Sequence, residues 1–315
     1  LVLGDGCSAL AGGRVTSIQT PGGCGALRIG AEVIHAAAPD ARVWVSDPTW
    51  PVHIPLLGSV GLAFQTYRYY EPLTHGVNFD GMVEDLKAAR AGDIVLLHGC
   101  CHNPCGADLT LQQWGVIADM AQQQGFTPFV DIAYQGLGDG LDEDAAGLRL
   151  LVSRLPEVIV AASCSKNLGL YRERTGAAIF VCSGEANANA ILSQALVAAR
   201  RMYSMPPAHG ALLAGRILAD EQLGAMWRAE LQAMCQRING LRSSLRHALE
   251  RYSGDDFAFI EQEKGMFSFL GLSVEQAVRL REEDAVYMLN SSRINVAGVN
   301  ANNLDYLAKA VARVL

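Results

Sequence analysis

The segment Val158-Ile-Val-Ala-Ala-Ser-Cys-Ser-Lys-Asn-Leu-Gly169 begins as an apolar run and ends in small polar residues around a single amine, that of Lys166. A continuous apolar run of this length is typical of a strand buried on both faces of a parallel sheet. In a partly desolvated pocket a lysine amine can stay neutral and form a Schiff base with an aldehyde. A lysine at a strand end is also often an ordinary solvated residue, so its surroundings decide between the two interpretations.

Other short apolar runs alternate with helical stretches along the first 180 or so residues of the chain. The runs are Val43 to Ser46, Ile94 to His98, Thr127 to Asp131 and Ala177 to Cys182, and helical stretches cover residues 26–38 and 111–124. This alternation predicts an α/β domain whose central sheet is mostly parallel, with helices on both faces. Ligands of such sheets bind at the carboxyl ends of the strands. Chemically distinctive side chains occur at or just after these ends, namely Asn103, Asp131, Tyr134 and Lys166.

The second half of the chain has a different pattern. Helices are predicted through Arg201, at 208–218 and, as one long amphipathic helix, at 221–252. Short strands around Phe257, 266–270 and 293–296 follow, with a helix from Val274 and a last helix capped by Asn302 or Asn303. We expect a large domain at 1–232 and a smaller α+β domain at 233–315, with a bend near Gln232.

The start of the chain, Leu1-Val-Leu-Gly4, has no basic segment or cleavage pattern typical of a targeting signal. We interpret these residues as the end of a helix and expect that an N-terminal portion is missing. No apolar run reaches the roughly 18 residues of a membrane span, so we expect no membrane partner.

Composition narrows the class of ligand. The chain has 315 residues, half of them apolar, which is enough for a large core. Its net charge of −7 and the lack of a Lys/Arg-rich run argue against nucleic acid and favour a small-molecule ligand.

The eight cysteines are irregularly spaced, which is typical of reduced thiols and predicts a cytoplasmic protein. Cys101 and Cys105 flank His102, but a second ligand pair at matching spacing is missing. We therefore expect no metal.

Several segments suggest contacts to an anionic, aromatic ligand. Thr20-Pro-Gly-Gly-Cys-Gly-Ala-Leu-Arg28 places glycines just before a helix, where backbone amides can hold a phosphate, or where glycine simply serves a tight turn. Asp131 at a strand end can either pair with a protonated pyridine nitrogen or cap a turn. The guanidinium groups of Arg174 and Arg293 can bind phosphate or carboxylate, or form surface ion pairs.

Aromatic side chains add to this set. Trp50 and Tyr134 offer a flat ring and a phenol near strand ends, although such residues more often serve packing. A phosphate cradle, a carboxylate, a phenol, a reactive lysine and two arginines together describe a pyridoxal phosphate site.

On these residues the sequence resembles the aspartate and aromatic aminotransferases of the class I, fold-type I pyridoxal phosphate family. The resemblance covers essentially the whole chain, and its strength lies in the order and spacing of its segments. These are 19–28, Asp47-Pro-Thr-Trp-Pro-Val-His53, Cys101-His-Asn-Pro-Cys-Gly106, Val130-Asp-Ile-Ala-Tyr-Gln-Gly136, Ser163-Cys-Ser-Lys-Asn-Leu-Gly-Leu-Tyr-Arg-Glu-Arg174, 203–210, Gly265-Met-Phe-Ser-Phe269 and Arg293-Ile-Asn-Val-Ala-Gly298.

The resemblance implies a role for each of these residues. Lys166 would hold the cofactor as a Schiff base and then act as general acid and base on the substrate α-carbon. Asp131 would hold the pyridinium, oriented by His53, while Asn103 and Tyr134 would bind the ring oxygen. Trp50 would stack on the ring, and Trp50 and Asn103 would also contact substrate. The phosphate would be bound by Gly23, Cys24, Ser163, Ser165 and Arg174.

The resemblance also implies how substrate is bound. Arg293 matches the residue that binds the substrate α-carboxylate. Arg200 matches the position that reaches a distal carboxylate from the other subunit, which implies a homodimer with shared active sites; the neighbouring Arg201 complicates this alignment.

Two departures from the family pattern stand out. Cys24 replaces the usual Thr or Ser in the phosphate loop. The family's N-terminal arm, substrate-covering segment and phosphate-binding tyrosine of the neighbouring chain have no counterpart here.

The leading functional hypothesis is a ping-pong transfer of the amino group from aspartate to 2-oxoglutarate, giving oxaloacetate and glutamate. Transamination of tyrosine or phenylalanine is the alternative, because relatives with that preference keep both arginines. A non-catalytic cofactor-binding fragment is a third hypothesis, motivated by the N-terminal region that we expect to be missing.

Overall fold

The computed structural model describes all 315 residues, and its central feature is a seven-stranded sheet. The strand order is β1-β9-β8-β7-β6-β2-β3. The pairs formed by β3, β2, β6, β7 and β8 are parallel, whereas β9 runs antiparallel to both of its neighbours. The predicted mostly parallel α/β sheet is therefore confirmed. The strands are β1 (Val15–Pro21), β2 (Arg42–Asp47), β3 (Ala63–Arg68), β6 (Ile94–His98), β7 (Thr127–Ile132), β8 (Val158–Ser163) and β9 (Thr175–Val181).

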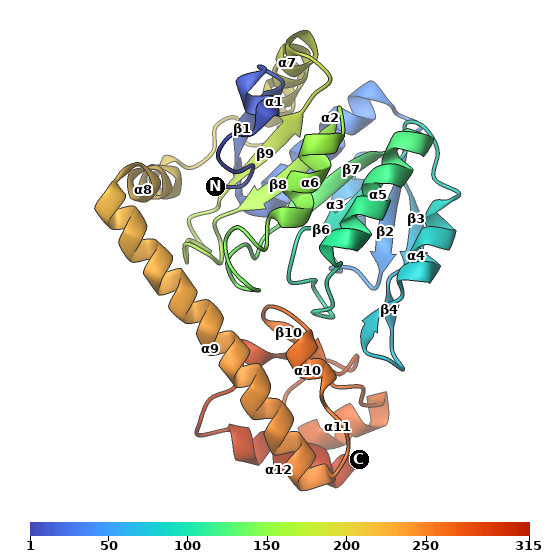
Figure 1. The fold of residues 1–315 in the computed structure, drawn as a ribbon, viewed down its shortest axis with the longest axis vertical. Helices are drawn as coiled ribbons and strands as arrows, with labels where there is room; N and C mark the ends of the chain where they lie inside the picture. Colours follow the sequence, from blue (N-terminus) through green and yellow to red (C-terminus); the bar gives the residue numbers. More distant parts are fainter.

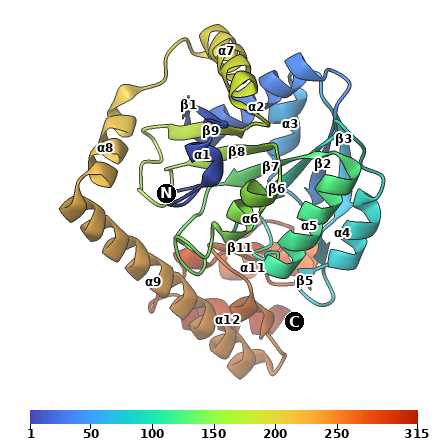
Figure 2. The same cartoon turned by 45° about the horizontal axis from the view of Figure 1, so that its top comes forward.

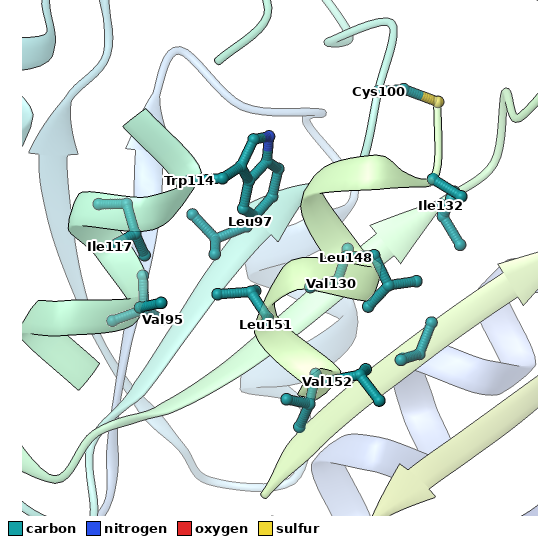
Figure 3. Close-up of a cluster of buried hydrophobic side chains, with 14 of the residues drawn as sticks. Val95, Leu97, Cys100, Trp114, Ile117, Val130, Ile132, Leu148, Leu151 and Val152 are labelled. Atoms are coloured by element: carbon teal, nitrogen blue, oxygen red, sulfur yellow. The ribbon is translucent and has the colours of Figure 1, made fainter. Parts of the chain in front are cut away.

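Helices cover both faces of this sheet (Figures 1 and 2). Alternate strand residues point to opposite faces, so Val95 and Leu97 of β6 join one buried cluster while Ile94 and Leu96 join another. The first cluster packs under α4 (Phe79–Leu86), α5 (Leu111–Gln124) and α6 (Ala146–Arg154), as Figure 3 shows for α5 and α6. The second packs under α2 (Gly22–Ala37), α3 (His53–Gly58) and α7 (Glu185–Met202). Each buried aliphatic side chain contributes roughly 1.5–3 kcal/mol.

The start of the chain differs from our expectation of a helix end. Residues 1–4 form no helix, and the four-residue α1 (Ser8–Ala11) begins only after them. Gly4 and Gly6 have φ angles of +79° and +77°, which a right-handed helix excludes. The carbonyl of Leu1 instead accepts a hydrogen bond from Arg149 Nη2 at 2.8 Å.

After α7 the chain continues with α8 (Ala208–Ala219) and the 33-residue α9 (Glu221–Ser253), which runs without interruption past Gln232. Figure 1 shows α9 running from α8, beside the sheet, to a separate group of C-terminal elements. That group has its own buried core, from Leu245 to Val314. Its elements are α10 (Phe259–Gln262), β10 (Phe267–Phe269), α11 (Val274–Asp284), β11 (Arg293–Asn295), a 3₁₀ turn (Val296–Gly298) and α12 (Leu304–Val314).

Two local predictions for this group need correction. No strand forms around Phe257, because the Asp256 carboxylate accepts from the Ala258 amide and starts the turn into α10, while Phe257 packs in the core. Asn303 occupies the N-cap position of α12 but makes no side-chain cap. Its amide oxygen accepts from the Asn300 amide at 2.7 Å and stabilises the preceding turn instead.

A small hairpin of β4 (Tyr70–Glu71) and β5 (Gly76–Val77) extends from the sheet toward the C-terminal group, as Figure 1 shows for β4. The His75 ring stacks on Phe259 of α10, with ring centroids 3.7 Å apart. No helix combines the length and the apolar character needed to cross a membrane.

Candidate active site

A cavity of about 320 Å³ lies where β2, β6, β7 and β8 end, and the C-terminal group forms its opposite wall. The sequence predicted a ligand site at the carboxyl ends of the strands, and the structure forms a cavity there. All of the predicted site residues except His53 and Arg200 line it: Gly23, Cys24, Trp50, Asn103, Asp131, Tyr134, Ser163, Ser165, Lys166, Arg174 and Arg293.

Lys166 follows β8 and is half-buried in the cavity wall. Its amine lies 4.7 Å from the centroid of the Tyr134 ring. Burial lowers the pKa of Lys166, and the nearby Asp131 carboxylate only partly offsets this effect. A lysine with a lowered pKa has a larger neutral fraction at physiological pH, which is the form that attacks a carbonyl.

The carboxylate of Asp131, at the end of β7, meets the buried ring of His53 behind the cavity wall. His53 Nε2 lies 3.1 Å from Asp131 Oδ2. Burial alone would raise the pKa of Asp131, but the hydrogen bond from His53 and the nearby basic side chains outweigh it and hold that pKa below its ordinary value. His53 therefore contacts Asp131 as the resemblance implies, without lining the cavity itself.

One end of the cavity is suited to an anion. It lies at the N-terminus of α2, which no side chain caps, so amides of the first turn lack intrahelical partners. Arg174 lies beside this turn, donating to the Pro21 carbonyl at 3.3 Å and to Ser165 Oγ at 3.4 Å. Ser163 in turn donates to Ser165 Oγ at 2.9 Å.

The close approach of Arg174 depends on a glycine. Gly22 has a φ angle of +69°, and a Cβ atom there would lie 2.5 Å from Arg174 Nη2. The prediction named Gly23 and Cys24 but not Gly22. The signal was present in the Pro-Gly-Gly sequence, since glycine is the residue that tolerates both this φ angle and this contact.

At the other end of the cavity, Arg293 Nη1 donates to Asn103 Oδ1 at 3.1 Å. The Arg293 guanidinium also lies 4.7 Å from the centroid of the Phe267 ring, and Phe267 packs edge-on against Tyr134. Burial, together with the Asp131 charge, raises the pKa of Tyr134 above its ordinary value. A phenol that stays protonated can donate a hydrogen bond to an anionic oxygen.

Some residues of the cavity were missed from the sequence. His98 lies next to Asp131 in the register of β6 and β7, so the aligned strand ends could have indicated it. Burial lowers the pKa of His98 to about 3. Tyr171 also lines the cavity, with its ring 5.7 Å from the Lys166 amine, and Met266 and Phe267 reach it from the C-terminal group.

Arg200 is the predicted residue that this chain does not bring to its own cavity. It is exposed near the end of α7 and donates to the hydroxyl of Ser204.

The cysteine segment brings several potential metal-ligating side chains together. Cys105 Sγ lies 3.1 Å from His102 Nδ1, and Cys100, Cys101 and Asp144 have side-chain atoms within 4.8 Å of one another. Both Asp144 oxygens already accept backbone N–H groups, from Gly136, Gly138 and Asp139. This carboxylate therefore organises the 136–144 turn.

The cavity combines groups that match the three reactive parts of pyridoxal phosphate. The half-buried Lys166 amine suits an aldehyde, the Asp131 carboxylate suits a pyridinium nitrogen, and the uncapped N-terminus of α2 with Arg174 suits a phosphate. Fold and cavity together define a pyridoxal phosphate-dependent enzyme of fold type I.

Comparison with known proteins gives the family. The model of aminotransferase class I and II matches residues 3–311, and the chain belongs to this family. It is 49% identical to an aromatic-amino-acid aminotransferase of Paracoccus denitrificans and 45% identical to the aspartate aminotransferase of Escherichia coli. Both alignments cover 100% of this chain, and 79% and 80% of those relatives respectively.

A solved structure gives the same result. The aromatic-amino-acid aminotransferase of Burkholderia pseudomallei, covalently bound to pyridoxal phosphate, superposes with a TM-score of 0.98 at 42% identity. That match covers 100% of this chain and 79% of the other. The present chain is therefore a pyridoxal phosphate-dependent aminotransferase.

Proposed function

We propose that this aminotransferase moves the amino group of aspartate to 2-oxoglutarate by a ping-pong mechanism. The observation that carries the proposal is that the Arg174 guanidinium, the Lys166 amine and the Arg293 guanidinium line one cavity. An amino acid needs an anchor for its α-carboxylate and a base at its α-carbon. Arg293 and Lys166 provide them.

Lys166 has two tasks in this proposal. Its amine would hold the cofactor covalently, and as a free amine it would carry a proton to and from the substrate α-carbon. When bound, pyridoxal phosphate supplies an electron-withdrawing ring that stabilises negative charge at that carbon. The lowered pKa of Lys166 favours the neutral amine that both tasks need.

Asp131 and Tyr134 set the electrostatics of the ring. Asp131, whose pKa is held low by the His53 hydrogen bond, would hold a proton on the ring nitrogen. Tyr134 and Asn103 would bind the ring oxygen, and Trp50 would contact both the ring and the substrate; all three side chains line the cavity. Gly23, Cys24, Ser163, Ser165 and Arg174 would hold the phosphate near the N-terminus of α2.

Substrate is oriented at the opposite end. Arg293 is held by Asn103 and by the face of Phe267, so its remaining N–H groups can pair with a carboxylate in a fixed direction. A preoriented guanidinium loses little entropy when it binds.

Transamination of an aromatic amino acid is the second candidate. The identity to the Paracoccus denitrificans enzyme, 49%, exceeds that to the Escherichia coli aspartate enzyme, 45%. The cavity walls also include apolar surfaces, from Trp50, Met266 and Phe267, that an aromatic side chain can contact.

We also propose a homodimer in which Arg200 serves the cavity of the partner. Exposed apolar side chains occur on α7, α8 and the first turns of α9, three consecutive helices of which Figure 2 shows α7 at the top of the molecule and α8 and α9 along its left edge. Such a surface is typical of a protein interface. These side chains are Leu196, Val197, Leu212, Leu213, Leu218, Leu223 and Met226.

Two further proposals concern organisation and location. We propose that the chain divides within α9 into a large unit at 1–232 and a small unit at 233–315. The first buried cluster includes α9 residues up to Ile238, and the C-terminal core begins at Leu245.

We propose a cytoplasmic location, supported by eight free cysteines, of which five are buried.

The test is the visible spectrum of the purified protein with added pyridoxal phosphate, followed by titration with aspartate or phenylalanine. A band that depends on Lys166 and is converted by aspartate at lower concentration supports the proposal. Preferential conversion by phenylalanine selects the aromatic alternative. A folded protein without such a band, indistinguishable from its Lys166→Ala variant, would instead indicate a non-catalytic fragment.

A further inference from the structure

Arg242 is a fully buried cation in the interior of α9, with 1% of its surface exposed. It does not line the cavity. Its guanidinium donates to the carbonyls of Ile260, Lys264, Gly265 and Phe267, over distances from 2.6 to 3.2 Å, and Nη1 lies 3.3 Å from Glu263 Oε2. A buried charge is costly unless it is paired and hydrogen-bonded. These partners satisfy that requirement and fix the backbone from residue 260 to residue 267.

The end of this fixed segment is a wall of the active site. Met266 and Phe267 both line the cavity, and the shortest bond of the set runs from Arg242 Nη2 to the Phe267 carbonyl at 2.6 Å. The Phe267 ring supports the Arg293 guanidinium, 4.7 Å from its centroid. Phe267 thus connects Arg242 to Arg293, whose guanidinium we propose binds the substrate carboxylate.

The same segment packs tightly on the loop that carries Asn103. The Lys264 amide donates to the Gly106 carbonyl at 2.7 Å. A Cβ atom on Gly106 would lie 2.5 Å from the Phe267 carbonyl oxygen, and one on Gly265 would lie 2.4 Å from Cys101 Cβ. Movement of the 260–267 backbone would therefore disturb both supports of Arg293, the Phe267 ring and the Asn103 amide.

We propose that Arg242 is a positioning residue for substrate recognition, which holds Phe267 and, through it, the carboxylate-binding geometry of Arg293. This inference rests on the proposed role of Arg293 in the aminotransferase reaction. It assigns to Arg242 no contact with substrate or cofactor.

Lysine cannot replace arginine at this position. The guanidinium presents five N–H donors in a rigid plane and serves five acceptor groups that lie in different directions, with the Gly265 carbonyl taking two contacts. An ammonium has three donors, so in an Arg242→Lys variant at least two of these acceptors lose their partner. The Arg242→Lys variant keeps a positive charge beside Glu263. Its effects therefore report the loss of hydrogen bonds to the backbone and not the loss of charge.

The experiment compares Arg242→Lys with Arg246→Lys in the holoenzyme. Arg246 lies one turn further along α9 and pairs with the side chains of Glu250 and Glu261, so it contacts one side chain of the 260–267 segment but donates to none of its backbone carbonyls. For Arg242→Lys we expect KM for aspartate and the Kd of the unreactive dicarboxylate succinate to rise about tenfold or more. We expect kcat to stay within about threefold, and the Kd for pyridoxal phosphate within about twofold. Arg246→Lys should leave all four quantities near wild type.

A Phe267→Leu variant keeps the Arg242 contacts, which go to the main chain, and removes the ring under Arg293. It should reproduce the increase in KM even if Arg242→Lys fails to fold. An unchanged KM in a folded Arg242→Lys or Phe267→Leu variant would overturn the inference, as would a parallel loss of cofactor affinity. Absence of a Lys166-dependent spectral band in the wild type would overturn the proposed function itself, and this inference with it.

Discussion

His53 Nε2 lies 3.1 Å from Asp131 Oδ2, and Nδ1 of the same ring lies 2.8 Å from the Thr49 hydroxyl. A neutral imidazole has one donor nitrogen and one acceptor nitrogen. With Nε2–H donating to the carboxylate, Nδ1 accepts from Thr49, whose oxygen can then accept from His98 Nε2 at 3.2 Å. In this series each group donates to the next one, and the last bond, from His53 to Asp131, stabilises the ionised carboxylate.

The first prediction concerns this carboxylate. Asp131→Asn keeps the size of the side chain but removes the charge that would hold a protonated ring nitrogen. We expect kcat to fall by about two to three orders of magnitude, the equivalent of breaking a buried charge pair. His53→Gln keeps a donor near the carboxylate and should cost about tenfold. Steady-state rates of the two variants check this order, and an equal loss in both would contradict it.

The second prediction concerns the amine of Lys166. The chain has four lysines, and burial lowers the pKa of Lys166. Reductive methylation of the protein without cofactor, followed by peptide mass spectrometry across a pH series, gives a midpoint for each lysine. The midpoint for Lys166 should lie below those of the surface residues Lys87 and Lys309. A coincident midpoint would show that the cavity does not favour the neutral amine.

The third prediction links His98 to acid stability. Its folded-state pKa of about 3 lies below its ordinary value, because burial, with the neighbouring His53, disfavours the imidazolium. The unfolded chain therefore takes up a proton near pH 6.5 that the folded chain refuses until about pH 3. Stability is fully present above pH 6.5 and is lost as pH falls, by up to about 1.4 kcal/mol per pH unit.

The matched variant for this measurement is His98→Gln. Urea unfolding of wild type and variant between pH 7 and pH 4 should show a shallower loss of stability in the variant. Parallel curves would mean that His98 is readily protonated in the folded state.

The fourth prediction concerns the Arg293 guanidinium. Arg293→Lys keeps the charge but loses the planar fork and the fixed contact with Asn103. We expect KM for the amino acid to rise by about 10- to 100-fold, the effect of losing one charge-assisted hydrogen bond, with a smaller change in kcat. Arg279→Lys, in an exposed pair with Glu283, is the control and should not change KM.

The sequence indicated the sheet and most of the cavity because both depend on local patterns. The apolar runs at β6, β7 and β8 lie in the predicted places, and residues such as Asp131 and Lys166 follow directly from strands. What it did not indicate depends on contacts between distant segments. Arg242 looks like any polar residue of an amphipathic helix, and only the fold brings the carbonyls of residues 260–267 around it. Phe257 was misassigned because its apolar character reflects core packing and not a strand.

The fifth prediction tests whether Arg200 acts across subunits. Arg200 is exposed and absent from the cavity of its own chain, so Lys166→Ala and Arg200→Ala lie in different sites if the partner supplies Arg200. In a symmetric dimer of one chain of each variant, one site would carry both substitutions and the other would carry neither. Random reassociation forms about half mixed dimers, each with one intact site of two, so the mixture should recover about a quarter of wild-type turnover of aspartate. Each variant alone should stay low, and Arg201→Ala should remain near wild type. If Arg200 serves its own chain, every site in the mixture keeps one substitution, and no activity returns on mixing.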